Sequence, residues 1–193
     1  MMVYQLALST RTAHRLASIA PVAGGALNGF LAPPAATMSL MDIHGSCDDI
    51  IPANISNSFE YNCSTNCTLP PDSRMGGPNG TTRSESSWLY VPQANLSSGF
   101  AAESRGECAG EPYEYFSPAL DSDAGRFQVE NVSWSCVAPH GRCSRDGIEV
   151  LRCTHSDGHI WPFMQSDRGF VFRWYARVVW EFFRAHPKVK ALH

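Results

Sequence analysis

Charged residues are scarce in this 193-residue chain, where Asp, Glu, Lys and Arg make up 17% of the positions and the formal net charge is −3. The chain lacks the basic excess with which nucleic-acid-binding proteins displace counterions from phosphates, so we expect no nucleic-acid partner. It also lacks an apolar run of the roughly 18 residues that cross a bilayer, so we expect no membrane partner. Hydrophobic residues nonetheless reach 44%, which excludes disordered, collagen-like and coiled-coil chains and predicts one folded domain.

Paired CxxC motifs, which hold structural zinc, are also missing, so we expect no metal and interpret the cysteines as disulfide-forming. Cytosolic thiols stay reduced, and a set of this kind is therefore typical of an oxidising compartment. Spacing alone does not choose the pairing, and Cys47, beside an apolar segment, is expected to be a core residue. The seven cysteines are Cys47, Cys63, Cys67, Cys108, Cys136, Cys143 and Cys153.

Asparagine is concentrated in glycosylation acceptors, because six of the eight asparagines head an Asn-x-Ser/Thr sequence. Chance would give far fewer, and we interpret the chain as a secreted or lumenal glycoprotein. The alternative is that these asparagines are ordinary polar loop residues. The six acceptors are Asn54, Asn62, Asn66, Asn79, Asn95 and Asn131.

A secretory leader is not visible at the N-terminus, where residues 1–8 have no basic region and the apolar run is interrupted by Tyr4 and Gln5. Glycosylation requires entry into the secretory pathway. We therefore expect residue 1 to lie inside a longer protein whose leader precedes it.

Helical and strand-like patterns alternate along the chain, and their order predicts an α/β domain with a mainly parallel sheet. The helical segments are residues 2–17 and 169–185, and the strand-like segments are residues 17–23, 38–44, 126–134 and 147–154. The last helix is amphipathic, and we expect its apolar side to face the core. A membrane-surface role for that helix is the alternative.

Residues 53–125 are rich in Asn, Ser, Gly and Pro and show little periodicity. Such a stretch is long for a structureless connection, so we expect a disulfide-rich, glycosylated insertion within a single domain that covers residues 1–193.

The first chemically unusual loop, residues 44–52, directly follows a predicted strand. An acidic residue there suits a carboxylate that orients a histidine, because functional loops of parallel sheets lie at the carboxyl ends of strands. The alternative is that Asp48 or Asp49 caps a following helix.

The second loop, residues 154–162, also follows a predicted strand and contains His155, Asp157 and His159. Histidine is the usual general base because its pKa lies near neutrality. Trp161 would supply an apolar wall beside it. Two alternatives are that the three polar residues bind a metal, or that His159 is an ordinary surface residue.

Four segments together resemble the secreted α/β-hydrolase esterases of the polyhydroxybutyrate depolymerase and feruloyl esterase group. They are residues 1–25, the His-Gly-x-x-Asp-x-x-x-Pro segment at 44–52, the Gly-His-x-Trp-Pro segment at 158–162, and residues 178–183. The resemblance implies a partial α/β-hydrolase fold that lacks its N-terminal strands. The chain order, an acid followed by a histidine, is that of the α/β-hydrolase triad.

Carried over by position, the resemblance makes Asp48 the triad acid, His159 the general base and Trp161 a substrate-binding residue. Asp49 is a minor alternative for the acid. Met1 and Met2 match the two methionines after the family's Gly-x-Ser-x-Gly elbow, a sequence that the 193 residues do not contain. The serine is therefore expected upstream of Met1. The family usually has glycines where Ser156 and Asp157 stand.

The resemblance implies a secreted serine esterase that needs no cofactor and acts on a polyester, feruloyl ester or acetyl ester, possibly polymeric. The 193 residues alone are expected to be inactive, because the nucleophile is missing. The alternatives are a non-catalytic secreted binding protein or degenerate hydrolase that uses Trp161 to hold a ligand, and a cysteine-rich structural protein.

Overall fold

The structure is a computed structural model of the chain. It describes residues 2–25, 34–46, 48, 51, 93–103, 110–115, 134–141, 143, 147–155, 158–159 and 171–188.

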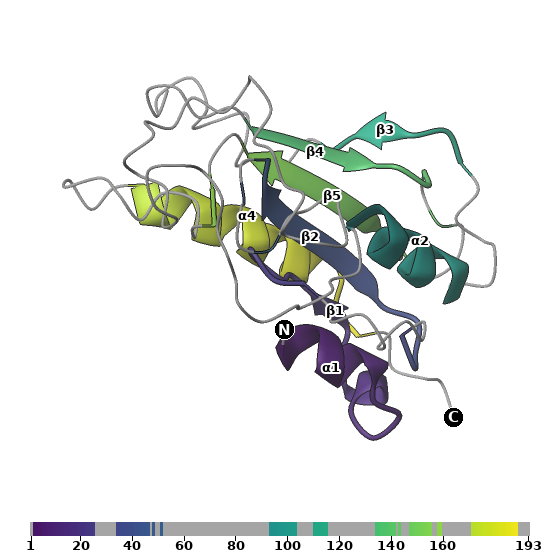
Figure 1. The fold of residues 1–193 in the computed structure, drawn as a ribbon. Coiled ribbons are helices and arrows are strands. Elements are labelled where there is room, and N and C mark those ends of the chain that lie inside the picture. Colours follow the sequence, from purple (N-terminus) through teal and green to yellow (C-terminus); the bar gives the residue numbers. More distant parts are fainter. Residues whose placement is uncertain are drawn as a thin grey trace.

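The centre of the molecule is a five-stranded sheet in the order β1-β2-β5-β4-β3 (Figure 1). The strands are β1 (Ser18–Ile19), β2 (Ser39–Gly45), β3 (Tyr113–Glu114), β4 (Trp134–Ala138) and β5 (Val150–His155). β1, β2 and β5 run parallel, whereas β4 and β3 are antiparallel to their neighbours. The predicted α/β class is confirmed at this level, but the sheet is mixed rather than mainly parallel.

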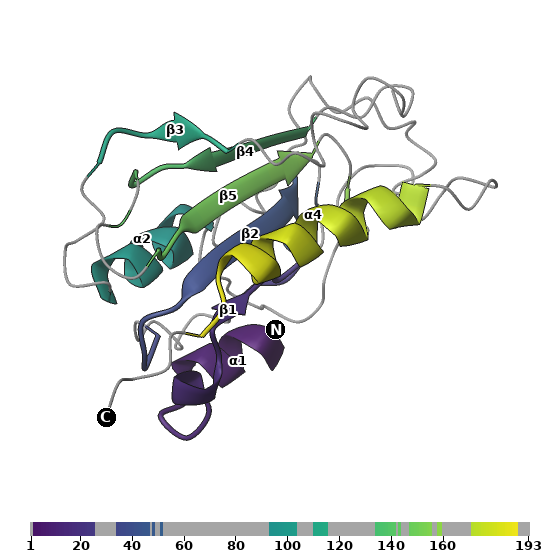
Figure 2. The ribbon, with the colours of Figure 1, turned by 180° about the vertical axis from the view of Figure 1, so that it is seen from behind.

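Helices cover both faces of the sheet. They are α1 (Met2–Leu8), α2 (Gln93–Glu103) and α4 (Val171–Ala185), with a short 3-10 helix, η1 (Ala13–Arg15), after α1. Figures 1 and 2, which view the molecule from opposite sides, show α2 in front of the sheet in one view and α4 in front in the other. Every residue of β2 is buried, as expected for a strand with both faces covered.

The two faces of β2 contribute to two separate apolar clusters, because successive side chains of a strand point in opposite directions. On the first face, Leu40 and Val150 pack with residues of α1 and α2, and the rings of Tyr4 and Phe100 meet edge-on at 6.4 Å. On the second face lie Met41, Ile43, Cys136, Leu151 and Cys153, with Val178 and Phe182 of α4.

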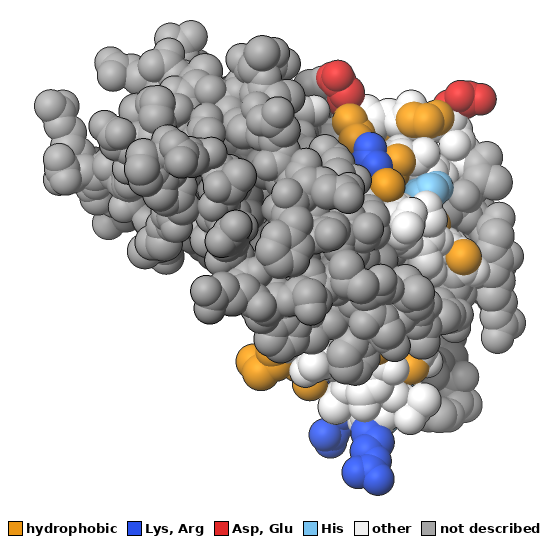
Figure 3. Space-filling view, in the orientation of Figure 1, with side chains coloured by type: hydrophobic (Ala, Val, Ile, Leu, Met, Phe, Trp, Pro, Cys, Tyr) orange, Lys and Arg blue, Asp and Glu red, His pale blue; other side chains and the backbone are white. Residues whose placement is uncertain are grey.

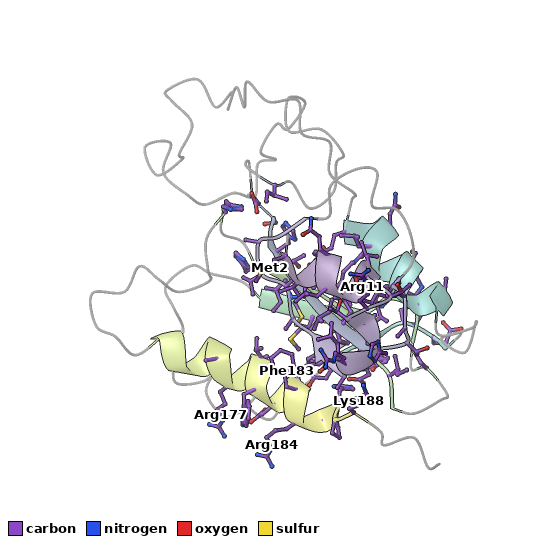
Figure 4. All side chains as sticks on the ribbon, turned by 90° about the horizontal axis from the view of Figure 1, so that it is seen from below. Met2, Arg11, Arg177, Phe183, Arg184 and Lys188 are labelled. Carbon is purple, nitrogen blue, oxygen red and sulfur yellow. A yellow bond between two sulfur atoms is a disulfide. The ribbon has the colours of Figure 1, made fainter. Side chains whose placement is uncertain are left out.

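The predicted core-facing orientation of the C-terminal helix is confirmed for the described side chains of α4. Val178 and Phe182 are fully buried, whereas Trp180 is 61% exposed. Arg177 and Arg184 project from the outer side of the helix (Figure 4). His186 ties the end of α4 to β5, because its Nδ1 lies 2.7 Å from the Phe182 carbonyl oxygen and its Nε2 lies 3.2 Å from Glu149 Oε2. None of the described helices is long and apolar enough to cross a membrane.

The N-terminal helix is shorter than the predicted 2–17, since α1 ends at Leu8. The Thr12 hydroxyl donates to the Leu6 carbonyl oxygen at 2.6 Å, which gives that carbonyl a side-chain partner in place of a helical amide. Ser, Thr and Arg at residues 9–12 favour such local hydrogen bonds, so the chain continues as a turn and η1. On the face seen in Figure 3, basic side chains lie at this end of the molecule, whereas acidic side chains and a further basic one lie at the end near β3.

The prediction of a loop-rich segment over residues 53–125 missed two elements, β3 and α2. Leu96, Phe100 and Ala101 of α2 are buried, and the helix contacts β2 and β5. The rest of the segment that the structure describes is residues 110–112 and Tyr115, and the remainder lies outside the described residues. Of the predicted strand at 126–134, the structure describes only Trp134, where β4 begins. Residues 126–133 lie outside the described residues.

A disulfide joins Cys136 and Cys153, which are register partners on the adjacent strands β4 and β5. Cys143 is disulfide-bonded as well. The prediction that the cysteines form disulfides is therefore confirmed for the three described ones. Cys47, Cys63, Cys67 and Cys108 lie outside the described residues.

Candidate active site

The candidate site lies where β2 and β5 end side by side. The two strands are parallel, and their last register pair is Gly45 and His155. The Ser46 amide then donates to the His155 carbonyl oxygen at 2.7 Å. The loops that follow the two strands therefore start from the same edge of the sheet, as expected for the carboxyl ends of parallel strands.

Asp48 is held in a tight turn just after β2. Its amide donates to the Gly45 carbonyl oxygen at 3.2 Å, and its Oδ1 accepts the Ile51 amide at 2.8 Å. The side chain is 0% exposed. A carboxylate that accepts the amide three residues later closes a local turn, and the helix that the capping alternative requires lies outside the described residues.

The same carboxylate also contacts His159. The Nδ1 atom of His159 lies 2.9 Å from Oδ2 and 3.1 Å from Oδ1 of Asp48. Because a carboxylate accepts hydrogen bonds, this contact places the proton of the neutral ring on Nδ1 and leaves the lone pair on Nε2. The His159 side chain is 29% exposed, so a buried acceptor orients a ring that solvent can reach.

This arrangement is able to move a proton. A histidine whose Nδ1 is fixed by a buried carboxylate can accept a proton at Nε2, and the carboxylate then stabilises the imidazolium that forms. The structure brings Asp48 and His159 together across 111 residues of sequence. Their catalytic roles stay predictions. Asp49, Asp157 and Trp161 lie outside the described residues.

Further buried polar residues lie on β2, on β5 and on a helix packed against them, and of these only His155 had an expected role, as a possible metal ligand. Asp42, His44 and His155 are each at most 2% exposed, as is the Tyr4 side chain. His44 stands in the loop segment that was singled out, and its position directly before Gly45 was a usable signal. Asp42 offered only a weak signal, as one acidic residue in an apolar strand.

The pKa values of the two buried histidines, His44 and His155, are shifted in opposite directions. Burial lowers the pKa of His44, but the carboxylates of Asp42 and Asp48, together with the Ile51 carbonyl oxygen, raise it by more, so the net change is upward. Burial and the nearby charge of His44 lower the pKa of His155 to about 4, although Asp48 acts in the opposite direction. Burial and then Asp42 raise the pKa of Tyr4 well above its ordinary value.

No group of three or more His, Cys, Asp or Glu side chains that could hold a metal ion occurs among the described residues. His155 is buried on β5 while His159 is in the loop, and the suggested third ligand, Asp157, is outside the described part. The metal alternative for this loop therefore has no support from the described geometry.

Among the predicted glycosylation acceptors, Asn95 is the one that the structure describes. It lies in the first turn of α2, and its side chain is exposed. Asn54, Asn62, Asn66, Asn79 and Asn131 lie outside the described residues.

Comparisons of the chain with protein-family models, with curated proteins and with solved structures find no match.

Proposed function

We propose that this chain carries the acid and base of a serine-type carboxylic ester hydrolase of the α/β-hydrolase fold. The observation that carries the proposal is the contact between the buried carboxylate of Asp48 and Nδ1 of the partly exposed His159. The position of both loops after adjacent parallel strands supports it, because active sites of α/β sheets gather at that edge.

In the proposed reaction a serine hydroxyl attacks the ester carbonyl carbon while Nε2 of His159 accepts the hydroxyl proton. Collapse of the tetrahedral intermediate breaks the bond to the alkoxy oxygen, and the alcohol leaves with the proton from Nε2. Water then attacks the acyl-enzyme with the same ring as base, which releases the acid and restores the serine. Asp48 keeps the ring in the required tautomer throughout.

The nucleophile is proposed to come from outside the 193 residues, since they contain no Gly-x-Ser-x-Gly segment. The substrate class is a polyester, a feruloyl ester or an acetyl ester. The six glycosylation acceptors and the disulfide-bonded cysteines support a secreted location.

The absence of a Gly-x-Ser-x-Gly segment from the 193 residues also supports a second candidate. This candidate is a secreted binding protein or degenerate hydrolase that keeps Asp48 and His159 but does not catalyse ester hydrolysis. The two candidates differ in one measurable property. An esterase expressed from the complete gene reacts with a fluorophosphonate probe at one serine, whereas a binding protein does not.

The test compares the protein expressed from its complete gene with its His159→Ala variant. We expect ester hydrolysis and serine labelling in the first, and a loss of kcat of at least about a thousandfold in the second, because the base is removed. His14→Ala is the matched control, since His14 is exposed on η1, and it should retain full activity. A loss of less than tenfold in His159→Ala would show that His159 is not the base.

The 193 residues by themselves form a second arm. They should give no burst of nitrophenol from p-nitrophenyl acetate, because without a nucleophile no acyl-enzyme forms. A burst stoichiometric with the chain would contradict this, and would place a nucleophile within these residues.

A further inference from the structure

A continuous line of buried polar groups runs from β2 to His159. His44 Nε2 lies 2.9 Å from the Ile51 carbonyl oxygen, so the ring donates to that carbonyl. The amide of the same residue, Ile51, donates to Asp48 Oδ1 at 2.8 Å. Ile51 is thus bound at its carbonyl by His44 and at its amide by the carboxylate that orients His159.

Two carboxylates flank the His44 ring. Nδ1 lies 3.7 Å from Asp42 Oδ1, and Nε2 lies 3.7 Å from Asp48 Oδ2. The two distances exceed those of hydrogen bonds, but they are short for charges that are buried to this degree. Asp42 is 0% exposed, and neither of its carboxylate oxygens accepts a hydrogen bond from a described residue. A buried carboxylate is tolerated where polar groups stabilise it, and the side chains of Tyr4 and His44 both interact with Asp42.

We propose that His44 is a positioning residue: its ring holds the Ile51 carbonyl, and through that peptide it fixes the Asp48 carboxylate that orients His159. This inference rests on the proposed role of Asp48 and His159, and it adds a residue that holds that pair in place.

The physical reason is the chain of short hydrogen bonds. The Ile51 amide fixes Oδ1 of Asp48 only while the Ile51 peptide is itself held, and the His44 ring holds it at the carbonyl. A carboxylate fixed in this way keeps its oxygens within reach of Nδ1 of His159. His159 is then kept in the tautomer whose Nε2 can accept a proton.

The other polar groups near His44 and Asp42 come from β5, α1 and α2. The nearby charge of His44 lowers the pKa of His155 of β5, and the net upward direction of the His44 pKa shows that Asp42, Asp48 and the Ile51 carbonyl outweigh the burial of His44. Tyr4 of α1 interacts with Asp42, and its raised pKa keeps it neutral. Arg152 of β5 is the register partner of Asp42. From α2, the neutral Gln93 donates to the Asp42 carbonyl oxygen at 3.2 Å.

The first measurement needs no variant. In the 193-residue chain, ring-nitrogen NMR shifts should show that Nε2 of His44 carries a proton, as donation to the Ile51 carbonyl oxygen requires. An unprotonated Nε2 would overturn the inference, whether or not any esterase activity is found.

The second measurement follows the downfield Nδ1 proton signal of His159 in His44→Gln and in His44→Leu. Gln can still donate to the Ile51 carbonyl, so the signal should be kept. Leu cannot donate, so the signal should be lost although the variant stays folded. A merely structural role would give the same His159 signal in both folded variants, and that result would refute the inference.

His14, which is exposed on η1, gives the matched control, and His14→Leu should leave the His159 signal unchanged. If the complete gene product proves to be inactive while the His159 signal responds as expected, the proposed function fails and this inference stands. If the product is active but the signal is the same in both His44 variants, the inference fails and the proposed function stands.

Discussion

The backbone amide of Ser46 donates a hydrogen bond to the carbonyl oxygen of His155 over 2.7 Å. This bond continues the β2–β5 ladder one step beyond the last register pair, Gly45 and His155. Asp48 lies two residues after Ser46, and His159 lies four residues after His155, so both are close in sequence to the hydrogen bond that joins the two strands. The sheet thus brings the starts of the two loops together, which allows the 2.9 Å contact between the two side chains.

The buried histidine at that junction makes stability depend on pH. The pKa of His155 is about 4 in the folded chain, against about 6.5 when unfolded, so the unfolded state binds more protons between these values. The free energy of unfolding should thus rise with pH across this window by roughly 3 kcal/mol from this group. Urea unfolding at several pH values should show the rise, and His155→Gln should flatten it.

His14→Gln is the control for that experiment and should keep the wild-type slope, because His14 is exposed. His44 acts with the opposite sign. Its raised pKa contributes stability that is present below about pH 6.5 and is lost as pH rises through its folded pKa. An unchanged slope in His155→Gln would show that another group governs acid stability.

The Cys136–Cys153 disulfide should contribute to stability by linking β4 to β5. It closes a segment of 17 residues, so replacing both cysteines by Ala should lower the free energy of unfolding by roughly 3 kcal/mol. The double variant Ser135→Ala/Thr154→Ala changes the next register pair on the same strands and should cost less than about 1 kcal/mol. Equal losses in the two double variants would mean that the disulfide adds nothing beyond packing.

Neighbouring aromatic residues of α4 should differ sharply in their contribution to stability. Phe182 is fully buried, so Phe182→Ala should cost about 3–5 kcal/mol through lost burial and the cavity that remains. Trp180 is 61% exposed, so Trp180→Ala should change stability by no more than about 0.5 kcal/mol. Thermal or urea unfolding measures both. A larger loss of stability in Trp180→Ala than in Phe182→Ala would show that the Trp180 side of α4 faces the sheet.

Asn95 should carry a glycan when the chain is expressed through a secretory pathway. Its side chain is exposed on α2, so an attached sugar would not disturb the core. Asn95→Gln should remove one glycan, seen as a single step in electrophoretic mobility that glycosidase treatment abolishes. Asn28→Gln is the matched control, because Asn28 does not head an acceptor sequence. An unchanged mobility in Asn95→Gln would show that this position is not used.

Some elements were predictable because their patterns are local. The run at 38–44 is apolar and ends at a glycine, and it became β2, offset by one residue. The amphipathic segment at 169–185 became α4. α2 was missed because Leu96, Phe100 and Ala101 are separated by Ser and Gly, so its apolar side is narrow. It is a helix in the structure because the sheet face beside it buries those three side chains.

The sequence by itself determined the α/β class, the buried central strand and the two loops that follow strands, because these features depend on residue type and on neighbours within a few positions. The choice of Asp48 and His159 within those loops came from the resemblance to the esterase group. Only the tertiary structure decided that β5 lies directly beside β2, and this pairing brings two residues 111 positions apart into contact. It also decided that Asp42 and His44 lie in the interior next to Asp48, because burial and the charges that surround a group are properties of the packed chain.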